Sequence, residues 1–216
     1  MANRNIPNKG AKRGRSRSVL QAAVLLSAAA CGQAQAPTAP ASAPPFTVSE
    51  VAKFSTPWAM AFIPGRGAAL TPMALVTEKE GALWLLDTAS GRRQAVSGVP
   101  RVSVGGQGGL GDVVVHPAFA SNQRVYLSFV EAGANGTKGA ALGYGRLVLG
   151  RGAPRLEGFR TIWRQSPKVE GNGHFIHRIA FGRDGLLYLS SGDRQKLTPA
   201  QDLGGGLGKI LRLTAE

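Results

Sequence analysis

From residue 46 onward the chain is a series of short apolar runs separated by turns rich in glycine and proline. Runs of this length, bounded by turn signals, are typical of β-strands that pack on both faces. The predicted strands occupy residues 58–63, 74–78, 83–87, 112–116, 124–129, 178–181, 186–190 and 207–213. No segment after residue 46 sustains the spacing of apolar positions that an amphipathic helix needs. We therefore predict an all-β fold.

The strand-turn-strand pattern repeats along the chain. Phe62, Val115 and Phe181 hold equivalent positions in it and lie 53 and 66 positions apart. Blades of β-propellers repeat at about 40–50 residues, and loop insertions lengthen them. We therefore predict that residues 46–216 are a partial β-propeller domain with about three blades. Because each blade covers its faces against two neighbours, we expect either a longer protein or self-association of two copies through open blade ends.

The first 45 residues follow a different pattern. A basic stretch to Ser18 leads into an apolar run over residues 19–30 and then to Cys31-Gly32, the layout of a secretory signal. The run is shorter than the ~20 residues of a membrane-spanning helix. We predict a signal peptide over residues 1–31, a Pro/Ala-rich linker over residues 32–45, and export to the periplasm.

Cys31 permits two interpretations. The stretch that ends in Ala29-Ala30-Cys31-Gly32 is similar to a bacterial lipoprotein cleavage site, at which a lipid anchor would join the Cys31 thiol. The alternative is a signal peptide cleaved nearby, in which Cys31 has no role. Export follows from the apolar run in both cases.

Composition and charge exclude several classes of protein. The chain is 43% hydrophobic, too apolar for a disordered protein, and its single cysteine excludes a disulfide framework and a multi-cysteine zinc site. A net charge of +14 suggests a nucleic-acid partner. However, six of the 26 basic residues fall within the first eighteen positions, and the others are scattered. Without a concentrated basic stripe we predict no nucleic-acid binding.

The first candidate for chemistry is a glutamine framed by glycines. Gln107 lies within Gly105-Gly106-Gln107-Gly108-Gly109-Leu110. Glycines permit positive φ and close backbone approach, an arrangement that suits an amide presented to a small polar ligand. The alternative is a flexible turn with a solvated Gln107. The run lacks the Gly-Lys-Ser/Thr ending of a phosphate-binding loop.

The second candidate is a histidine and an aspartate at the two ends of a predicted hairpin. His174 precedes one strand and Asp193 follows the next, so the carboxylate can hold the imidazole in one tautomer, as a general base requires. The alternative is a capped turn and an exposed histidine. His177, three residues on, would face the opposite side of a strand, so we predict no two-histidine metal site. His116, before Pro117 at a strand end, is interpreted as structural.

Together these sequence motifs resemble those of the soluble quinoprotein glucose/sorbosone dehydrogenases, the aldose sugar dehydrogenases. The resemblance covers most of residues 54–213. It rests on the motifs at residues 57–62, 106–119, 173–178, 185–194 and 201–212. It implies a six-bladed β-propeller whose central channel holds pyrroloquinoline quinone (PQQ) with calcium. It further implies that an aldose sugar is oxidised at its anomeric hydroxyl to a lactone, with hydride transfer to the quinone.

The same resemblance implies a role for four residues. His174 matches the general base, Asp193 its carboxylate partner, and Gln107 the glutamine that faces cofactor and substrate. Arg178 follows the histidine motif and is expected to support the site. The resemblance assigns no metal ligand to this chain and names no electron acceptor.

Two departures from the family change what we expect of this chain. Ile176 and His177 stand where the family has small residues, so one wall of the site differs. The calcium ligands and most of the basic residues that hold the quinone carboxylates belong to later blades. We therefore expect residues 1–216 alone to bind quinone weakly and to be inactive or nearly so.

Two other functions are kept as alternatives. The first is a non-catalytic exported β-propeller that binds a partner or acts as a scaffold. The second is a calcium-dependent lactone hydrolase on a similar propeller, which would need an acidic ring in the channel. Only twelve acidic residues are present, and several lie in turns at strand edges.

Overall fold

The computed structural model describes residues 46–64, 72–175 and 177–216. The predicted signal peptide, Cys31, the linker and Ile176 lie outside the described residues. The strands belong to one compact unit, Val48–Glu216. Within the described residues, no helix is long and apolar enough to cross a lipid bilayer.

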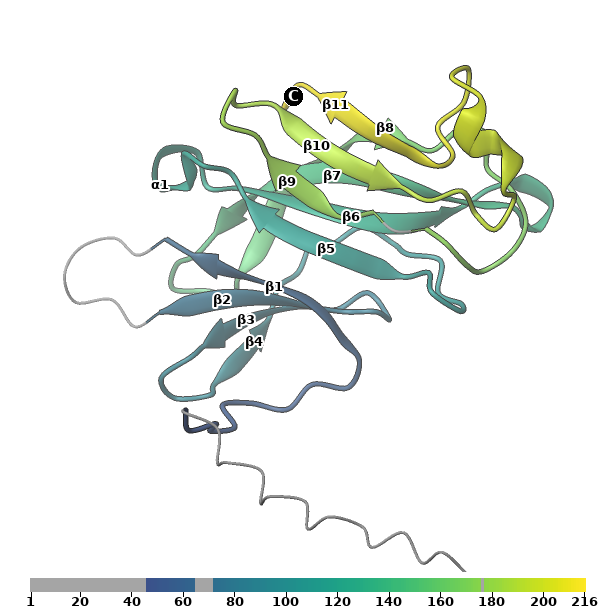
Figure 1. The fold of residues 1–216 in the computed structure, drawn as a ribbon. Helices are drawn as coiled ribbons and strands as arrows, with labels where there is room; N and C mark the ends of the chain where they lie inside the picture. Colours follow the sequence, from purple (N-terminus) through teal and green to yellow (C-terminus); the bar gives the residue numbers. More distant parts are fainter. Residues whose placement is uncertain (1–45, 65–71, 176) are drawn as a thin grey trace, which may run out of the picture. The chain divides into compact units, whose positions relative to one another are not determined.

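The strands form three antiparallel sheets that follow one another along the chain (Figure 1). The first sheet contains β1 (Pro57–Ile63), β2 (Met73–Glu78), β3 (Leu83–Asp87) and β4 (Arg93–Ala95), in that order. The second contains β5 (Leu110–Val115), β6 (Arg124–Ala132), β7 (Lys138–Val148) and β8 (Arg155–Arg164). The third contains β9 (Ile179–Phe181), β10 (Leu187–Ser191) and β11 (Lys209–Leu213), in the order β11-β10-β9. Sequential sheets of neighbouring strands are the arrangement of propeller blades, which confirms the predicted all-β class.

Helical structure in the described residues is limited to short connections. These are α1 (Phe119–Asn122) and two 3₁₀ turns at Ala134–Gly136 and Thr198–Gln201. Each spans three or four residues, and each lies between strands.

The sequence prediction missed β4, β7 and β8. β7 carries glycines at 139, 143 and 145, which weaken the apolar signal of a strand. At Gly143 an added Cβ would come within 2.8 Å of the Phe159 ring on β8, so the glycine makes room for its neighbour. The pairing of β7 with β6 and β8 therefore depends on contacts across the sheet rather than on the residues of β7 alone.

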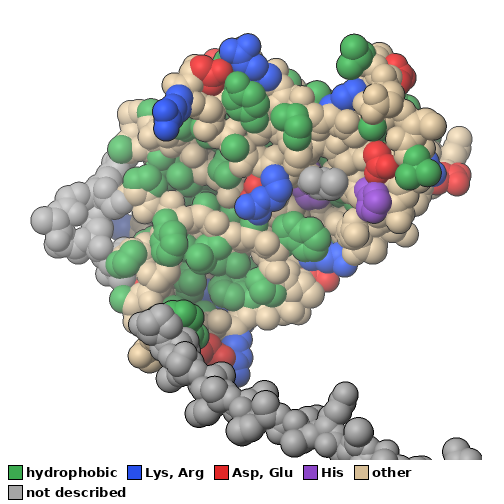
Figure 2. Space-filling view, in the orientation of Figure 1, with side chains coloured by type: hydrophobic (Ala, Val, Ile, Leu, Met, Phe, Trp, Pro, Cys, Tyr) green, Lys and Arg blue, Asp and Glu red, His purple; other side chains and the backbone are tan. Residues whose placement is uncertain are grey.

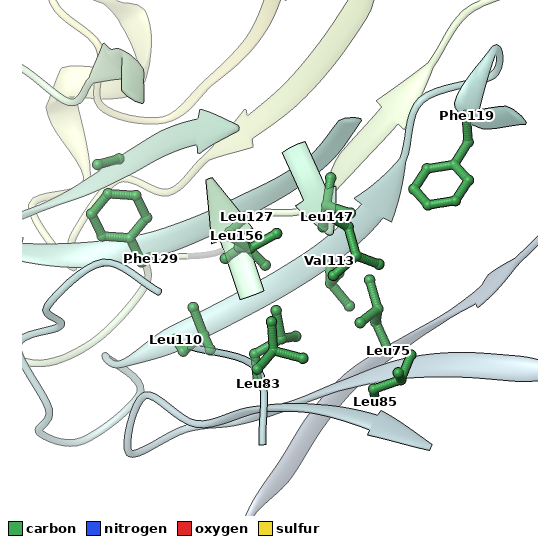
Figure 3. Packing of buried hydrophobic residues seen from close by; sticks show 13 residues of the cluster. Leu75, Leu83, Leu85, Leu110, Val113, Phe119, Leu127, Phe129, Leu147 and Leu156 are labelled. Carbon is green, nitrogen blue, oxygen red and sulfur yellow. The ribbon is translucent and has the colours of Figure 1, made fainter. Parts of the chain in front are cut away.

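The core consists of two layers, one on each face of the second sheet. In the first layer, Leu75, Leu83 and Leu85 of the first sheet meet residues of the second sheet (Figure 3). Their partners there include Leu110, Val113, Leu127, Phe129, Leu147 and Leu156. In the second layer, Tyr126, Leu142 and Tyr144 meet Ile179, Leu187 and Leu189 of the third sheet. Because successive side chains of β6 point to opposite faces, one strand supplies both layers.

The first sheet exposes apolar side chains on the face that does not meet the second sheet. Trp58, Met60 and Phe62 alternate along β1 and are 45%, 54% and 59% exposed. An apolar groove of ≈ 420 Å³ lies on this face, lined in part by Val51, Phe54, Trp58, Met60 and Leu86. Hydrophobic side chains gather visibly over the part of the molecule that holds β1 (Figure 2).

Candidate active site

Three loops at the ends of strands of the second and third sheets form the candidate site. They are the segment before β5 that carries Gln107, the segment before β9 that carries His174, and the segment after β10 that carries Asp193. Gln107 Oε1 accepts a hydrogen bond from the His174 backbone N–H (2.7 Å), and the Gln107 backbone N–H donates to Asn172 O (2.8 Å). The two sequence clusters are therefore parts of one site.

His174 and Asp193 are in contact. His174 Nδ1 lies 2.8 Å from Asp193 Oδ1. The Asp193 carboxylate also accepts the backbone N–H groups of Gln195 (3.0 Å) and Leu197 (3.2 Å). The hydrogen bond from His174, followed by the one from Gln195, holds the pKa of Asp193 below its usual value. An ionised carboxylate only accepts, so Nδ1 is the donor to Asp193, and in the neutral imidazole Nε2 is the nitrogen with the lone pair.

The accessibility of the pair differs between its two members. The His174 side chain is 46% exposed and that of Asp193 is 21% exposed. The imidazole can therefore be reached by a small molecule, while its carboxylate partner is set further into the protein. This is the arrangement expected of a base that meets a ligand and of a group that orients the base.

The backbone of the site is held in an unusual conformation. His174, Arg194, Gln195 and Leu197 have φ between 49° and 62°, the left-handed region that non-glycine residues rarely adopt. Each such residue costs about 1–3 kcal/mol and persists only where the surroundings enforce it. Because strain of this kind gathers at functional sites, it marks the His174 and Asp193 loops as a candidate site independently of their sequence motifs.

Gly192 permits the close approach of the two loops. A Cβ added at Gly192 would overlap the carbonyl oxygen of His174, a backbone atom that cannot move aside on its own. We expect Gly192→Ala to destabilise the protein by about 1–3 kcal/mol, because the two loops must separate to relieve the overlap. Chemical denaturation measures this loss.

Gly150→Ala is the matched control for this prediction. An added Cβ at Gly150 meets nothing within 4 Å. Its stability should stay within about 0.5 kcal/mol of the unsubstituted protein. Equal stability of the two variants would contradict the close approach of the loops at Gly192.

Arg178 forms no hydrogen bond or ion pair with His174 or Asp193. Its guanidinium Nη1 lies 3.2 Å from Asp112 Oδ1, and the side chain is 69% exposed. Asp112 is buried and also accepts the backbone N–H of Ile179 (2.8 Å), and burial raises the pKa of this carboxyl. The contacts of Arg178 therefore serve the junction between β5 and β9, and its expected support of the site stays a prediction.

His177 is buried, whereas His174 is exposed. The His177 imidazole packs against Gly111, where an added Cβ would overlap the ring. His177 Nδ1 lies 2.7 Å from Ser128 Oγ, and this hydroxyl donates to His177 O (2.6 Å). Burial lowers the pKa of His177 to about 4, so the ring is neutral at pH 7.

Three residues that shape the site were not assigned a role from the sequence. Lys138 Nζ donates to Asn172 Oδ1 (2.7 Å), and Arg194 reaches the main chain of the His174 loop. Arg194 lies next to Asp193 in the motif at residues 185–194, and this was the only sequence feature that pointed to it. Asn172 lies in the glycine-flanked run that leads to His174, whereas Lys138 gave no signal. Their contact depends on how β7 is placed beside the loop before β9.

Metal-ligating side chains do not gather in the described part of the chain. No three His, Cys, Asp or Glu residues there lie close enough together to hold a metal ion. The candidate site is thus an imidazole, a carboxylate and an amide on a strained backbone.

Comparison with known proteins identifies the family of this chain. The Glucose / Sorbosone dehydrogenase family pattern matches residues 54–216. The aldose sugar dehydrogenase YliI of Escherichia coli (strain K12) is 40% identical over 162 residues, covering 75% of this chain and 42% of that protein. The chain therefore spans less than half the length of this relative.

Solved structures give the same result. A crystal structure of glucose dehydrogenase is 42% identical, with a TM-score of 0.68, over 74% of this chain and 44% of that one. The PQQ-bound form of an aldose sugar dehydrogenase from Streptomyces coelicolor is 29% identical, with a TM-score of 0.58, over 76% of this chain and 46% of that one. The three sheets are thus about three blades of a propeller of this type. The resemblance seen in the sequence is confirmed, and the chain belongs to the glucose/sorbosone dehydrogenase family.

Proposed function

We propose that this chain provides the proton-accepting part of a PQQ-dependent site that oxidises aldose sugars to lactones. The observation that carries the proposal is the 2.8 Å contact between His174 Nδ1 and Asp193, which leaves an exposed imidazole beside Gln107. The family and the PQQ-bound relative support the choice of substrate class and cofactor.

His174 is the general base in this proposal. Its Nε2 lone pair takes the proton of the anomeric hydroxyl, and Asp193 stabilises the imidazolium that results. Bound quinone would supply the oxidant that accepts the hydride from the anomeric carbon. Loss of that proton and hydride converts the anomeric C–OH into the lactone carbonyl.

Gln107 orients the ligand in this proposal. The backbone N–H of His174 can only donate, so the atom of Gln107 that it meets is the amide oxygen. The amide Nε2–H groups are then the donors that Gln107 presents to a ligand. A single side chain thus connects the position of the base to that of the bound molecule.

The residues of the candidate site are better suited to transferring a proton than to binding PQQ. Two cations near these loops already have partners, since Lys138 binds Asn172 and Arg178 pairs with Asp112. No cluster of three His, Cys, Asp or Glu residues occurs in the described part of the chain, so we assign no calcium ligand to it. We therefore propose that a quinone with three carboxylates is bound weakly by this chain alone.

The test uses the chain and a chimera in which residues 54–216 replace the matching segment of the Escherichia coli aldose sugar dehydrogenase. Both are reconstituted with PQQ and calcium, and dye reduction is followed with glucose and other aldoses. We expect quinone-dependent turnover from the chimera and little from the chain. A folded chimera that binds quinone but oxidises no aldose would contradict the proposal and favour a non-catalytic propeller module.

The location of this reaction rests on the sequence alone. The basic and apolar pattern of residues 1–31 supports export to the periplasm, and the setting of Cys31 supports a lipid anchor as one of two alternatives. Mass spectrometry of the exported protein distinguishes a lipid on the Cys31 thiol from cleavage nearby without one.

A further inference from the structure

Arg194 is a buried cation whose hydrogen-bond partners are main-chain oxygens. The residue is 1% exposed. Its Nε donates to Gly173 O (2.9 Å), Nη2 to Gly171 O (2.5 Å) and Nη1 to Lys138 O (2.5 Å). The guanidinium carbon lies 3.6 Å from the centre of the Phe175 ring. A charge is costly to bury unless its surroundings satisfy it, so these contacts fix where the guanidinium sits.

Arg194 also holds most of the main chain that leads to His174. The carbonyls of Gly171 and Gly173 accept from its side chain, and that of His174 accepts from its backbone N–H (3.3 Å). The remaining carbonyl of this stretch, Asn172 O, accepts from the Gln107 backbone N–H (2.8 Å). All four consecutive carbonyls of residues 171–174 are therefore held, three of them by Arg194.

Neighbouring residues thus control the imidazole in two ways. Asp193 binds the ring of His174, and Arg194 binds the backbone that carries the ring. His174 (φ 49°) and Arg194 (φ 58°) keep their positive φ only if contacts with other residues hold the backbone in place. The hydrogen bonds between the Arg194 guanidinium and the carbonyls of the His174 loop are such contacts. A lysine could not replace the fork, because its donors radiate from one nitrogen, whereas the guanidinium places donors on three.

We propose that Arg194 is a positioning residue that sets the orientation of the His174 imidazole by clamping residues 171–174. The chemical use of His174 rests on the proposed function, but its positioning does not. Removing the guanidinium leaves the carbonyls of Gly171, Gly173 and Lys138 without this partner. The loop then relaxes from its left-handed conformation, and His174 leaves the Asp193 carboxylate.

The experiment observes the His174 ring directly. The whole chain has three histidines, so a long-range ¹H–¹⁵N spectrum of histidine-labelled protein contains one set of signals each for His116, His174 and His177. The His174 set is assigned with His174→Ala. In the unsubstituted protein, we expect the neutral form of the His174 ring to be the tautomer protonated on Nδ1.

Arg194→Met should convert the His174 signals to the mixture of tautomers of a free imidazole. The His116 and His177 signals should not move, because those rings have other partners. Arg194→Lys, which keeps the charge and loses the fork, should give an intermediate result. Arg164→Met is the matched control, since Arg164 is 56% exposed and pairs with Glu131, and it should leave all three sets unchanged.

Two outcomes would overturn the proposal. In one, a folded Arg194→Met protein keeps the His174 signals of the unsubstituted protein. In the other, both Arg194 variants lose all three sets together, which would make Arg194 a residue of the whole fold. The spectrum needs neither quinone nor turnover, so the two proposals can fail separately. If the chimera binds quinone but is inactive, and the His174 signals of the chain still shift in Arg194→Met, the proposed function is refuted and this inference is upheld.

Discussion

Alanine in place of His174 lowers aldose oxidation by the quinone-loaded chimera by about 10²–10⁴-fold. This is the usual contribution of a positioned general base. The imidazole is 46% exposed, so its removal should leave the thermal unfolding midpoint nearly unchanged. Steady-state dye reduction, together with calorimetry of the same samples, separates lost chemistry from lost folding.

Asp193→Asn refines this prediction. Asparagine keeps the shape of the side chain but removes the charge that holds the Nδ1-protonated tautomer, so turnover should also fall. Asp87→Asn is the matched control, because the Asp87 carboxylate likewise accepts two backbone N–H groups within a turn, those of Ala89 (3.0 Å) and Ser90 (3.1 Å). Full activity in His174→Ala would rule out the proposed base, and full activity in Asp193→Asn would rule out its proposed carboxylate partner.

Acid should destabilise the fold through His177. Burial lowers the pKa of this imidazole to about 4 from 6.5, so between these values the unfolded chain binds a proton that the folded chain does not. The stability that the neutral ring contributes is complete above pH 6.5 and is lost as the pH falls toward 4. The loss amounts to about 3 kcal/mol.

The substitution that isolates this effect is His177→Asn. The asparagine amide can still donate to Ser128 Oγ, but it does not titrate. The His177→Asn protein should be less stable than the unsubstituted protein at pH 7, because the volume of the ring is lost from the core. Nearby Asp112 has a raised pKa, which acts in the opposite direction, and both proteins share it. Urea unfolding from pH 7 to pH 4 should give a steeper loss for the unsubstituted protein, and parallel curves would exclude His177 as the acid-sensitive group.

The local pattern of residues was enough to predict much of the fold. Apolar runs between turn residues placed β1, β2, β3, β5, β6, β9, β10 and β11 close to their observed positions. β7 was missed because the glycines around Gly143 interrupt its apolar run, and its pairing is decided by what packs beside it. β4 and β8 were missed as well. A strand whose glycines exist to admit other side chains cannot be identified from its own residues.

The motifs also predicted the central pair of the site but not its surroundings. Gln107, His174 and Asp193 stood out because each lies between glycines or at the end of a predicted strand, where loops present side chains. Two arginines of similar sequence context then proved to have opposite environments. Arg178 is exposed and pairs with Asp112, whereas Arg194 is buried beneath the His174 loop.

The sequence by itself determined the all-β class, the family and the three side chains of the candidate site, because these depend on local spacing and on short motifs. The tertiary structure alone decided which arginine is buried, that the ring of His177 fills the space above Gly111, and that residues 171–174 are clamped. The physical reason is that the energy of a charged or polar group depends on the atoms around it, and those atoms come from strands distant in the chain.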